Sequence, residues 1–261
     1  DKYVLVNIPS FRLRAVDSKK NLEMRIGCGS FDTKTPLLTS AIMRMDINPQ
    51  WIVPRSIIKK SIIPHLGNRS YFESHNFFVR ERSTGKKISF DKVTSEMLNS
   101  SDYLVVQAGG IGNSLGRIIF RFNNSFSVFI HDTNQHGVFS QEDRGVSHGC
   151  IRVQKPFSLA MFMLKDKNED IISKIRYSMV AQIGGESTVM DDEKHEGNSK
   201  LKTDTLNHSR IINNINVNPK VPLFITYFTL YPDFEGNIKS FSDVYGYDRV
   251  IFSILKNYLG H

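Results

Sequence analysis

Short runs of alternating apolar and polar residues recur along the chain, with turn-forming residues between them. The first run ends at Pro9 and Ser10, and a second run follows at once, which is the pattern of a β-hairpin. In a later run the apolar side chains occupy every second position, at Leu22, Met24 and Ile26. The expected strands cover residues 3–8, 11–16, 22–28, 39–47, 103–106, 118–122, 126–130, 221–228 and 238–241. These runs predict an α+β fold that is predominantly β.

Helical patterns are few and short. Pro54 stands where a first helical position would lie, and Ile58, Ile62 and Leu66 recur at helical spacing. Pro64 lies within this pattern, and we expect it to break the helix. Other expected helices cover residues 91–98, 156–164, 169–179 and 249–259. We therefore expect short helices that accompany the sheet.

Two segments interrupt the strand pattern within a single expected domain of residues 1–261. Residues 53–101 are long enough to form an insertion between core strands, either a lid over a site or a solvated excursion. Residues 184–209 are rich in Asp, Glu, Lys, Asn and Ser, which predicts a mobile polar loop.

The formal net charge of +8 suits an anionic partner such as nucleic acid, a membrane surface or an acidic wall polymer. The basic residues are dispersed and form no dense run, so we expect no nucleic-acid partner. No run approaches the roughly 18 apolar residues of a transmembrane helix. The chain begins at Asp1 with a strand pattern, so we expect a removed or missing upstream segment, which would hold any signal or membrane anchor.

A glycine-rich stretch, residues 107–117, follows an expected strand. Its glycines do not match the dinucleotide fingerprint, and no Gly-Lys-Ser/Thr sequence follows as a phosphate loop requires. The next segment, 118–122, is an expected strand and not the helix that would hold a phosphate. The sequence therefore predicts a sharp turn or a close backbone approach, and no nucleotide cofactor.

The chain has two cysteines, which excludes a disulfide scaffold and a four-cysteine zinc site. Cys28 lies on the apolar face of an expected strand and is interpreted as a packed core residue. Cys150 lies in Ser147-His148-Gly149-Cys150, and His131 ends an apolar run upstream, with fifteen residues between it and Ser147. A thiol with nearby imidazoles has the parts of an activated nucleophile, so both thiols are expected to be free.

The roles of the two imidazoles follow from their spacing. His148 is only two residues from Cys150, whereas His131 can approach the sulfur from another strand, so we assign His131 as the base. Gly149 permits a tight turn in which the N–H groups of His148, Gly149 and Cys150 could face an oxyanion.

Two further interpretations of this region remain open. Arg152 could grip a substrate carboxylate, or it could form an ion pair with Asp143. His131, Asp132, His136, His148 and Cys150 could in principle bind zinc, but their spacing matches no standard site, so we expect no metal.

Together these residues resemble the signature of the YkuD-type L,D-transpeptidases. The resemblance to the larger, YcbB-like branch extends over most of the chain, through Val6-Asn7-Ile8-Pro9, Thr35-Pro36, residues 48–54, residues 112–116 and Tyr245-Gly246-Tyr247-Asp248. Many YkuD-type members carry Asn at the position of Arg152, whereas the YcbB-like branch uses Arg. The resemblance implies a YkuD-like β-sandwich with short helices, and a substrate-capping insertion at residues 53–101; it does not account for residues 184–209.

The resemblance implies that Cys150 attacks the third-residue carbonyl of a tetrapeptide stem of peptidoglycan and expels the terminal D-Ala, with His131 as base. The thioester would pass to an amine of a second stem or to water, and carbapenems would acylate the same sulfur. Ser147 and Asn113 are expected near the substrate. Trp51 is interpreted as a core residue or as an aromatic platform at the lip of the cleft.

Two alternatives remain open: a cysteine carboxypeptidase that only trims stems, and a non-enzymatic wall-binding module. The resemblance places the protein in the periplasm or cell envelope, where the upstream segment would provide the only membrane contact. We expect a monomer without a cofactor.

Overall fold

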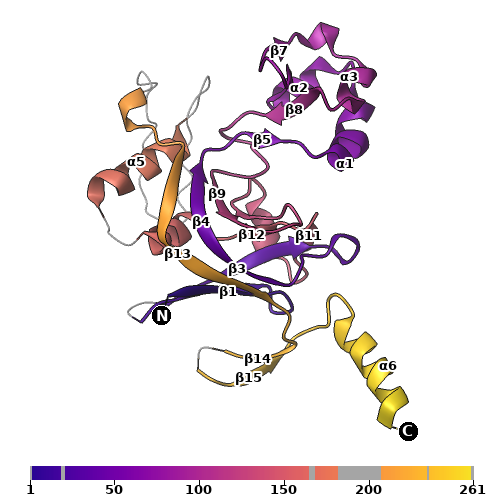
Figure 1. The fold of residues 1–261 in the computed structure, drawn as a ribbon, viewed down its shortest axis with the longest axis vertical. Helices are drawn as coiled ribbons and strands as arrows, with labels where there is room; N and C mark the ends of the chain where they lie inside the picture. The colour runs from indigo at the N-terminus through magenta and orange to yellow at the C-terminus, as the bar shows by residue number, and fades with distance from the viewer. Residues whose placement is uncertain (1, 19–20, 165–167, 182–206, 234, 260–261) are drawn as a thin grey trace. The chain divides into compact units, whose positions relative to one another are not determined.

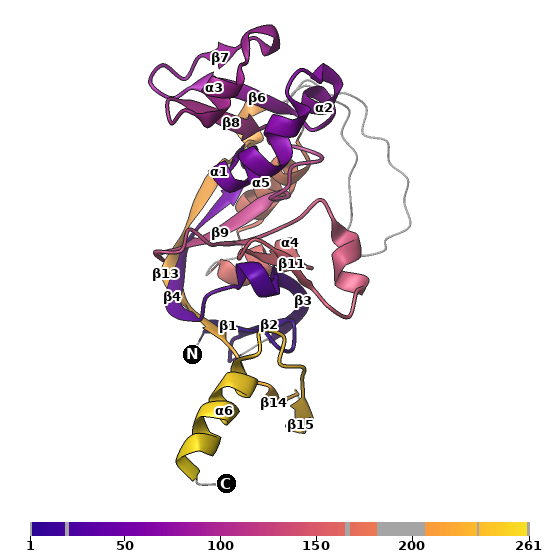
Figure 2. The ribbon, with the colours of Figure 1, turned by 90° about the vertical axis from the view of Figure 1, so that its right-hand side faces the viewer.

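The computed structural model describes residues 2–18, 21–164, 168–181, 207–233 and 235–259 (Figures 1 and 2). The chain forms two compact units. The first contains residues 1–45, 120–168 and 214–261, and the second contains residues 46–119 and 169–213.

Nine strands of the described residues form the sheet of the first unit, in the order β11-β3-β12-β10-β9-β4-β13-β1-β2. Their bounds are β1 (Tyr3–Asn7), β2 (Arg12–Val16), β3 (Leu22–Gly29), β4 (Leu38–Ile47), β9 (Ile118–Phe122), β10 (Ile130–His131), β11 (Gly145–Ser147), β12 (Ile151–Val153) and β13 (Asn214–Thr226). The predominantly β fold class predicted from the alternating runs is confirmed.

The strand order returns on itself. β2, the last strand of the order, pairs with β1 on one side and with β3 on the other. The strands from β3 to β2 therefore form a closed sheet, and β11 pairs with β3 outside it. The first strand also pairs in parallel with β13, with Val4 opposite Leu223. A sheet that closes in this way leaves few unpaired edges.

The core of this unit consists of the apolar side chains that the alternation placed on one face. Val4, Val6, Leu13, Ile26 and Cys28 are each 0% exposed. The hairpin predicted for residues 3–16 is confirmed by the antiparallel pairing of β1 with β2.

The predicted strand over residues 126–130 is wrong except at its end, because β10 contains only Ile130 and His131. The side chain of Asn124 hydrogen-bonds the main chain of the segment before β10. Its Oδ1 accepts from the N–H groups of Phe126 and Val128, and its Nδ2 donates to the carbonyl of Val128 at 2.8 Å. Such local side-chain bonds compete with ladder formation, and they turn the chain before it reaches His131.

Helix α4 (Pro156–Met163) follows β12 as predicted, and a hairpin of β14 (Leu230–Pro232) and β15 (Ile238–Ser240) follows β13. The last helix, α6 (Tyr247–Leu259), extends away from the sheet in both views (Figures 1 and 2). Most of its apolar side chains are exposed, including Phe252 at 69% and Tyr258 at 84%. Among its described residues, those of the first turn bond the preceding segment: Asp248 accepts from Thr229 Oγ1 at 2.5 Å, and the N–H of Arg249 donates to Asp243 at 3.1 Å.

The second unit has a four-stranded sheet in the order β5-β8-β6-β7. The strands are β5 (Trp51–Ile52), β6 (Phe77–Glu81), β7 (Lys87–Ile88) and β8 (Tyr103–Gln107). Short helices lie beside this sheet: α1 (Arg55–Ile57), α2 (Arg69–Ser74) and α3 (Ser95–Asn99) (Figure 2). Its own apolar cluster is formed by Val53, Ile58, Ile62, Phe72, Val79, Leu98 and Val105.

The helices predicted in this unit are largely confirmed. Helix α1 continues as a π-helical turn (Ile58–Ile62) and a 3-10 turn (Ile63–His65), and it buries Ile58 and Ile62 as their spacing predicted. The helix predicted from residue 91 begins later, at Ser95. Thr94 caps it by accepting a hydrogen bond from the N–H of Met97, while residues 90–92 form a separate 3-10 turn.

Helix α5 (Glu169–Val180) matches its prediction, and a 3-10 turn (His208–Arg210) precedes β13. Most of the predicted polar loop 184–209 lies outside the described residues. In the part of the chain that is described, no helix has the length and hydropathy to cross a membrane.

Candidate active site

The turn that carries Cys150 is held by its own side chains. Ser147 Oγ donates to the carbonyl of Cys150 at 2.6 Å and accepts from the N–H of Gly149 at 3.1 Å. Gly149 has φ +112°, and a Cβ there would lie 3.3 Å from Val128 Cγ1. The turn therefore requires glycine at this position, both for its backbone conformation and for space.

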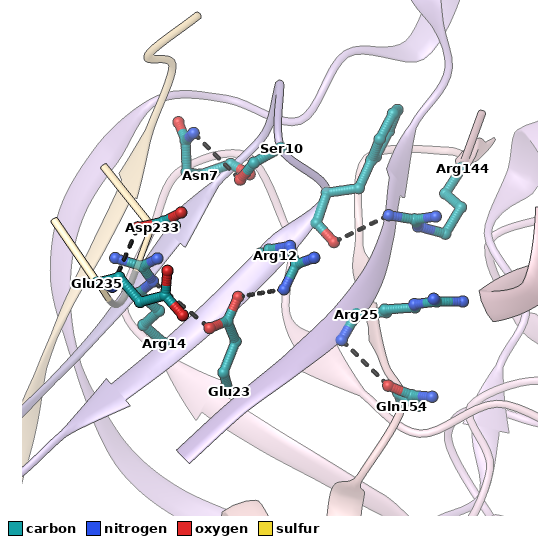
Figure 3. A network of polar contacts seen from close by, with 11 residues as sticks. Asn7, Ser10, Arg12, Arg14, Glu23, Arg25, Arg144, Gln154, Asp233 and Glu235 are labelled. Atoms are coloured by element: carbon teal, nitrogen blue, oxygen red, sulfur yellow. Dashed lines mark hydrogen bonds and ion pairs between the residues drawn. The ribbon is translucent and has the colours of Figure 1, made fainter. Parts of the chain in front are cut away.

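Both flanks of the turn are hydrogen-bonded to β3 or to its neighbours, and Figure 3 shows Arg144 and the contact between Arg25 and Gln154. On one flank, Arg144 is 9% exposed, and its guanidinium donates to the carbonyls of Ile26, Phe11 and Gln141. On the other flank, Gln154 and Arg25 exchange two hydrogen bonds, at 3.1 and 3.2 Å. Rigid flanks of this kind keep a reactive side chain in one place.

His131 lies opposite Arg152 in the parallel pairing of β10 with β12. Its side chain is buried, at 4% exposure, and its Nδ1 hydrogen-bonds the carbonyl of Asp132. A carbonyl can only accept, so Nδ1 carries the proton and Nε2 is the basic nitrogen. His148, in contrast, is exposed. This tautomer of His131 fits the role of base, which for His131 stays a prediction.

Cys150 is half-buried, and Cys28 is buried; both thiols are free. Burial raises the pKa of the Cys150 thiol, while a main-chain hydrogen bond from Phe129 and the charges of Arg152 and Arg121 oppose that rise. The thiol is therefore protonated at rest, and the surrounding donor and cations favour the thiolate once the proton leaves.

The guanidinium of Arg152 could bind an anion. Its NH1 donates to Gln135 Oε1 at 2.8 Å, and among the described residues its buried Nε has no hydrogen-bond acceptor. Burial lowers the pKa of Arg152, but a guanidinium remains charged at neutral pH. The alternative partner, Asp143, instead accepts from the N–H of Gly145 at 2.9 Å.

A pocket of about 290 Å³ adjoins this guanidinium. Its walls are Gln135, Gly137, Val138, Gln141, Val146 and Arg152. One cation in a small pocket of polar and apolar walls suits a carboxylate attached to a short aliphatic chain.

The predicted set of three oxyanion donors needs one correction. The N–H of Gly149 is already bonded to Ser147 Oγ, so it is not available to a substrate. The N–H groups of His148 and Cys150 donate to no protein acceptor among the described residues, which leaves these two as candidates for an oxyanion.

Trp51 and Asn113, both predicted near the substrate, belong to the second unit. Trp51 packs partly buried against the apolar cluster of that unit. Asn113 is 1% exposed, and its amide bonds the carbonyls of Pro49 and Ala108 and the N–H of Leu115. Their predicted role toward a substrate stays a prediction.

Sequence reasoning missed Arg121 and Arg144. Arg121 is the single charged residue of β9, and its guanidinium lies 4.8 Å from the ring centroid of Phe129. A lone arginine in an otherwise apolar strand is a signal that could have identified it. Arg144 carries no comparable signal, because its partners are main-chain carbonyls of distant segments. In the described chain, no group of three or more His, Cys, Asp or Glu residues is placed to hold a metal ion.

Comparison with known proteins gives matches to one family. A protein of Haemophilus influenzae, whose assigned name places it with the L,D-transpeptidases, is 28% identical over 265 residues, covering 98% of this chain and 48% of that protein. This chain thus spans about half the length of its curated relative.

Two solved structures are more distant. An L,D-transpeptidase from Mycobacterium smegmatis is 16% identical, with a TM-score of 0.34 over 62% of this chain and 52% of that one. The catalytic domain of the E. faecium L,D-transpeptidase acylated by ertapenem is 15% identical, with a TM-score of 0.28 over 64% of this chain and 92% of that one.

The family model described as YkuD, the L,D-transpeptidase catalytic domain, matches residues 1–171. That range holds β1 to β12 and therefore all the residues around Cys150 described above. The chain belongs to the YkuD family of L,D-transpeptidase catalytic domains.

Proposed function

We propose that this chain catalyses L,D-transpeptidation of peptidoglycan stems, with Cys150 as nucleophile and His131 as base. The observation that carries the proposal is the pairing of β10 with β12, which sets His131 opposite Arg152 on the strand that begins directly after Cys150. A buried imidazole on the strand next to that of Arg152, in a family whose chemistry is acyl transfer, supports His131 as the base for Cys150.

In the first half-reaction, Nε2 of His131 takes the proton of Cys150 as the sulfur attacks the carbonyl of the third residue of a tetrapeptide stem. The resulting oxyanion is stabilised by the N–H of Cys150. The tetrahedral species collapses as the bond to the terminal D-Ala breaks, and the imidazolium returns its proton to the departing amine. The products are a thioester and free D-Ala.

In the second half-reaction, a side-chain amine of another stem attacks the thioester. His131 takes a proton from that amine and returns it to the sulfur, which leaves a bond between two third residues and a regenerated thiol. Water in place of the amine would give a trimmed stem. The proposal favours the amine because the family is defined by transfer and not by hydrolysis.

Substrate recognition is assigned to the pocket beside Arg152. Stem peptides carry carboxylates on short aliphatic chains, which match its single guanidinium and its mixed walls. The net charge of +8 favours the approach of such an acidic polymer. The proposal also includes a capping role for residues 53–101 and a place in the cell envelope, where peptidoglycan lies.

The first test is the intact mass of the protein after exposure to ertapenem. A β-lactam carbonyl should acylate Cys150, so the wild-type protein should gain the mass of one inhibitor and Cys150→Ala should gain none. Cys28 remains in that variant and controls for non-specific labelling of thiols. An unmodified wild type, or an adduct that persists in Cys150→Ala, would contradict the assignment.

The second test separates the three activities with purified tetrapeptide muropeptides. A transpeptidase yields free D-Ala and cross-linked dimers, whereas a carboxypeptidase yields only trimmed stems. A wall-binding module leaves the muropeptides intact, and its binding would be insensitive to Cys150→Ala. Dimers that disappear in Cys150→Ala are the expected outcome.

A further inference from the structure

Thr35 lies far from Cys150 in sequence but is hydrogen-bonded to the turn that carries it. It is 0% exposed, and its Oγ1 donates to the carbonyl of Gly149 at 2.9 Å. We propose that Thr35, held by Tyr245, is a positioning residue that orients the N–H of Cys150 toward the oxyanion. This inference rests on the proposed acyl-transfer function.

The geometry of one peptide group carries the argument. The carbonyl of Gly149 and the N–H of Cys150 belong to the same planar trans peptide, so they point in opposite directions. A hydroxyl that fixes the carbonyl on one side therefore fixes the direction of the N–H on the other. Bonding at the carbonyl also polarises the peptide, which makes its N–H a stronger donor.

This peptide needs an external anchor. Gly149 has φ +112° and no side chain, so the turn has little intrinsic rigidity at this point. Ser147 bonds the N–H of Gly149 and the carbonyl of Cys150, the groups on either side of the peptide in question. Thr35 bonds the carbonyl of Gly149, which belongs to the peptide between those two groups.

The hydroxyl of Thr35 is bonded on both sides. It accepts from the N–H of Gly29 at 2.9 Å and donates its single proton to the carbonyl of Gly149. The hydroxyl of Tyr245 accepts from the N–H of Thr35 at 3.1 Å and donates to the carbonyl of Gly29 at 2.7 Å, with Cys28 Sγ as a more distant second acceptor at 3.5 Å. These bonds hold Thr35 from its main chain as well as from its side chain.

Tyr245 is placed by the segment that follows β13. It is 2% exposed, its N–H donates to the hydroxyl of Tyr227 at 2.7 Å, and its carbonyl accepts from Lys34 Nζ at 3.0 Å. The rings of Tyr227 and Tyr245 are stacked, with centroids 5.6 Å apart. Burial raises the pKa of Tyr245, so its hydroxyl remains a donor throughout the neutral range. The end of the chain is thereby connected to the turn around Cys150.

The test compares two reactions of the same sulfur. Acylation by ertapenem creates an oxyanion, whereas alkylation by iodoacetamide does not. In Thr35→Val we expect the rate of acylation to fall by about ten- to a hundredfold, which does not exceed the fall caused by removing an oxyanion donor altogether. The rate of alkylation should be unchanged. Thr35→Ser, which keeps the hydroxyl, should restore acylation to within a few-fold of wild type.

Thr226→Val is the matched control, because Thr226 also donates its hydroxyl to a buried main-chain carbonyl, that of Val6 at 2.9 Å, but on β13. It should leave both rates unchanged. Tyr245→Phe keeps the ring and removes the three bonds of the hydroxyl, to Thr35, Gly29 and Cys28, so it provides a second variant should Thr35→Val fail to fold. It should slow acylation by roughly three- to tenfold and leave alkylation unchanged.

Equal losses in both reactions would indicate a structural role only and would overturn the inference, as would a normal acylation rate in the variants. These results differ from a failure of the proposed function. In that case wild-type Cys150 would react with iodoacetamide and not with ertapenem, and the positioning role would fall with it.

Discussion

At the scale of single residues, two thiols of one chain occupy environments with opposite consequences. Burial raises the pKa of Cys28 to about 11, and Cys28 is 0% exposed. The pKa of Cys150 is also raised by burial, but Phe129, Arg152 and Arg121 counteract that effect, and the side chain is only half-buried. Only Cys150 combines access with stabilisation of the thiolate.

The first prediction concerns the pH dependence of alkylation by iodoacetamide. The folded-state pKa of Cys150 lies above its usual value, so the thiolate fraction, and with it the rate, should rise continuously from pH 6 to pH 9. Peptide mapping should find the label on Cys150 and not on Cys28. A rate that is constant below pH 7 would indicate a preformed thiolate and contradict the prediction.

The second prediction concerns Arg144, whose guanidinium bonds three main-chain carbonyls beside the turn. Arg144→Met should lower the free energy of unfolding by about 2–3 kcal/mol, because buried acceptors lose charged donors. The control is Arg12→Met, since Arg12 is 51% exposed in its ion pair with Glu23 and should cost less than about 1 kcal/mol. Chemical denaturation measures both, and equal losses would refute the role assigned to Arg144.

The residues that could be predicted are those with a local signal. Cys150, His131 and Gly149 were predicted from spacing, because the nucleophile, the base and the tight turn each require a particular residue type. Thr35 and Arg144 could not be assigned, because each acts through main-chain carbonyls of segments that are distant in sequence. The availability of an N–H group likewise depends on side-chain bonds such as that of Ser147.

At the scale of elements, periodicity predicted most strands and helices, and it failed where side chains bonded the local backbone. The run 126–130 has the composition of a strand, yet Asn124 holds its first residues in a turn. No strand was expected in residues 67–90, but β6 and β7 form there because they pair with each other and β6 pairs with β8. Pairing between strands is a tertiary effect that the sequence of one segment does not contain.

The third prediction compares two isoleucines of the second unit. Ile62 is 1% exposed in the apolar cluster, so Ile62→Ala should lower the free energy of unfolding of that unit by about 2–4 kcal/mol through loss of burial and creation of a cavity. Ile52 on β5 is 52% exposed, and Ile52→Ala should cost about 0.5 kcal/mol or less. Thermal unfolding of the two variants checks this, and similar shifts would count against the cluster as the core of this unit.

At the scale of the whole molecule, the chain has two compact units, and the apolar cluster of the second unit draws only on its own residues. Separate cores permit separate unfolding transitions. Trp51 is the only tryptophan and packs against the cluster of the second unit, whereas Cys150 belongs to the first. The two units therefore have independent natural probes.

The fourth prediction uses these probes in the Ile62→Ala variant. The denaturant midpoint followed by Trp51 fluorescence should fall, while the midpoint followed by the loss of ertapenem acylation at Cys150 should change much less. Coincident shifts of both midpoints would mean that the two units unfold as one. Wild-type protein measured by both probes provides the baseline.

The pairing of β1 with β13 has a consequence for the order of folding. Val4 lies opposite Leu223, so the sheet can close only after β13 has been synthesised, long after β1, and long-range pairings of this kind form slowly. Until then β1 and β4 lack β13 between them and present unpaired edges, which are sites of aggregation in nascent proteins. Tyr245 lies beyond β13, so its bond to Thr35 forms later still. A nascent chain would therefore carry Cys150 before Tyr245 could hold Thr35 against the turn.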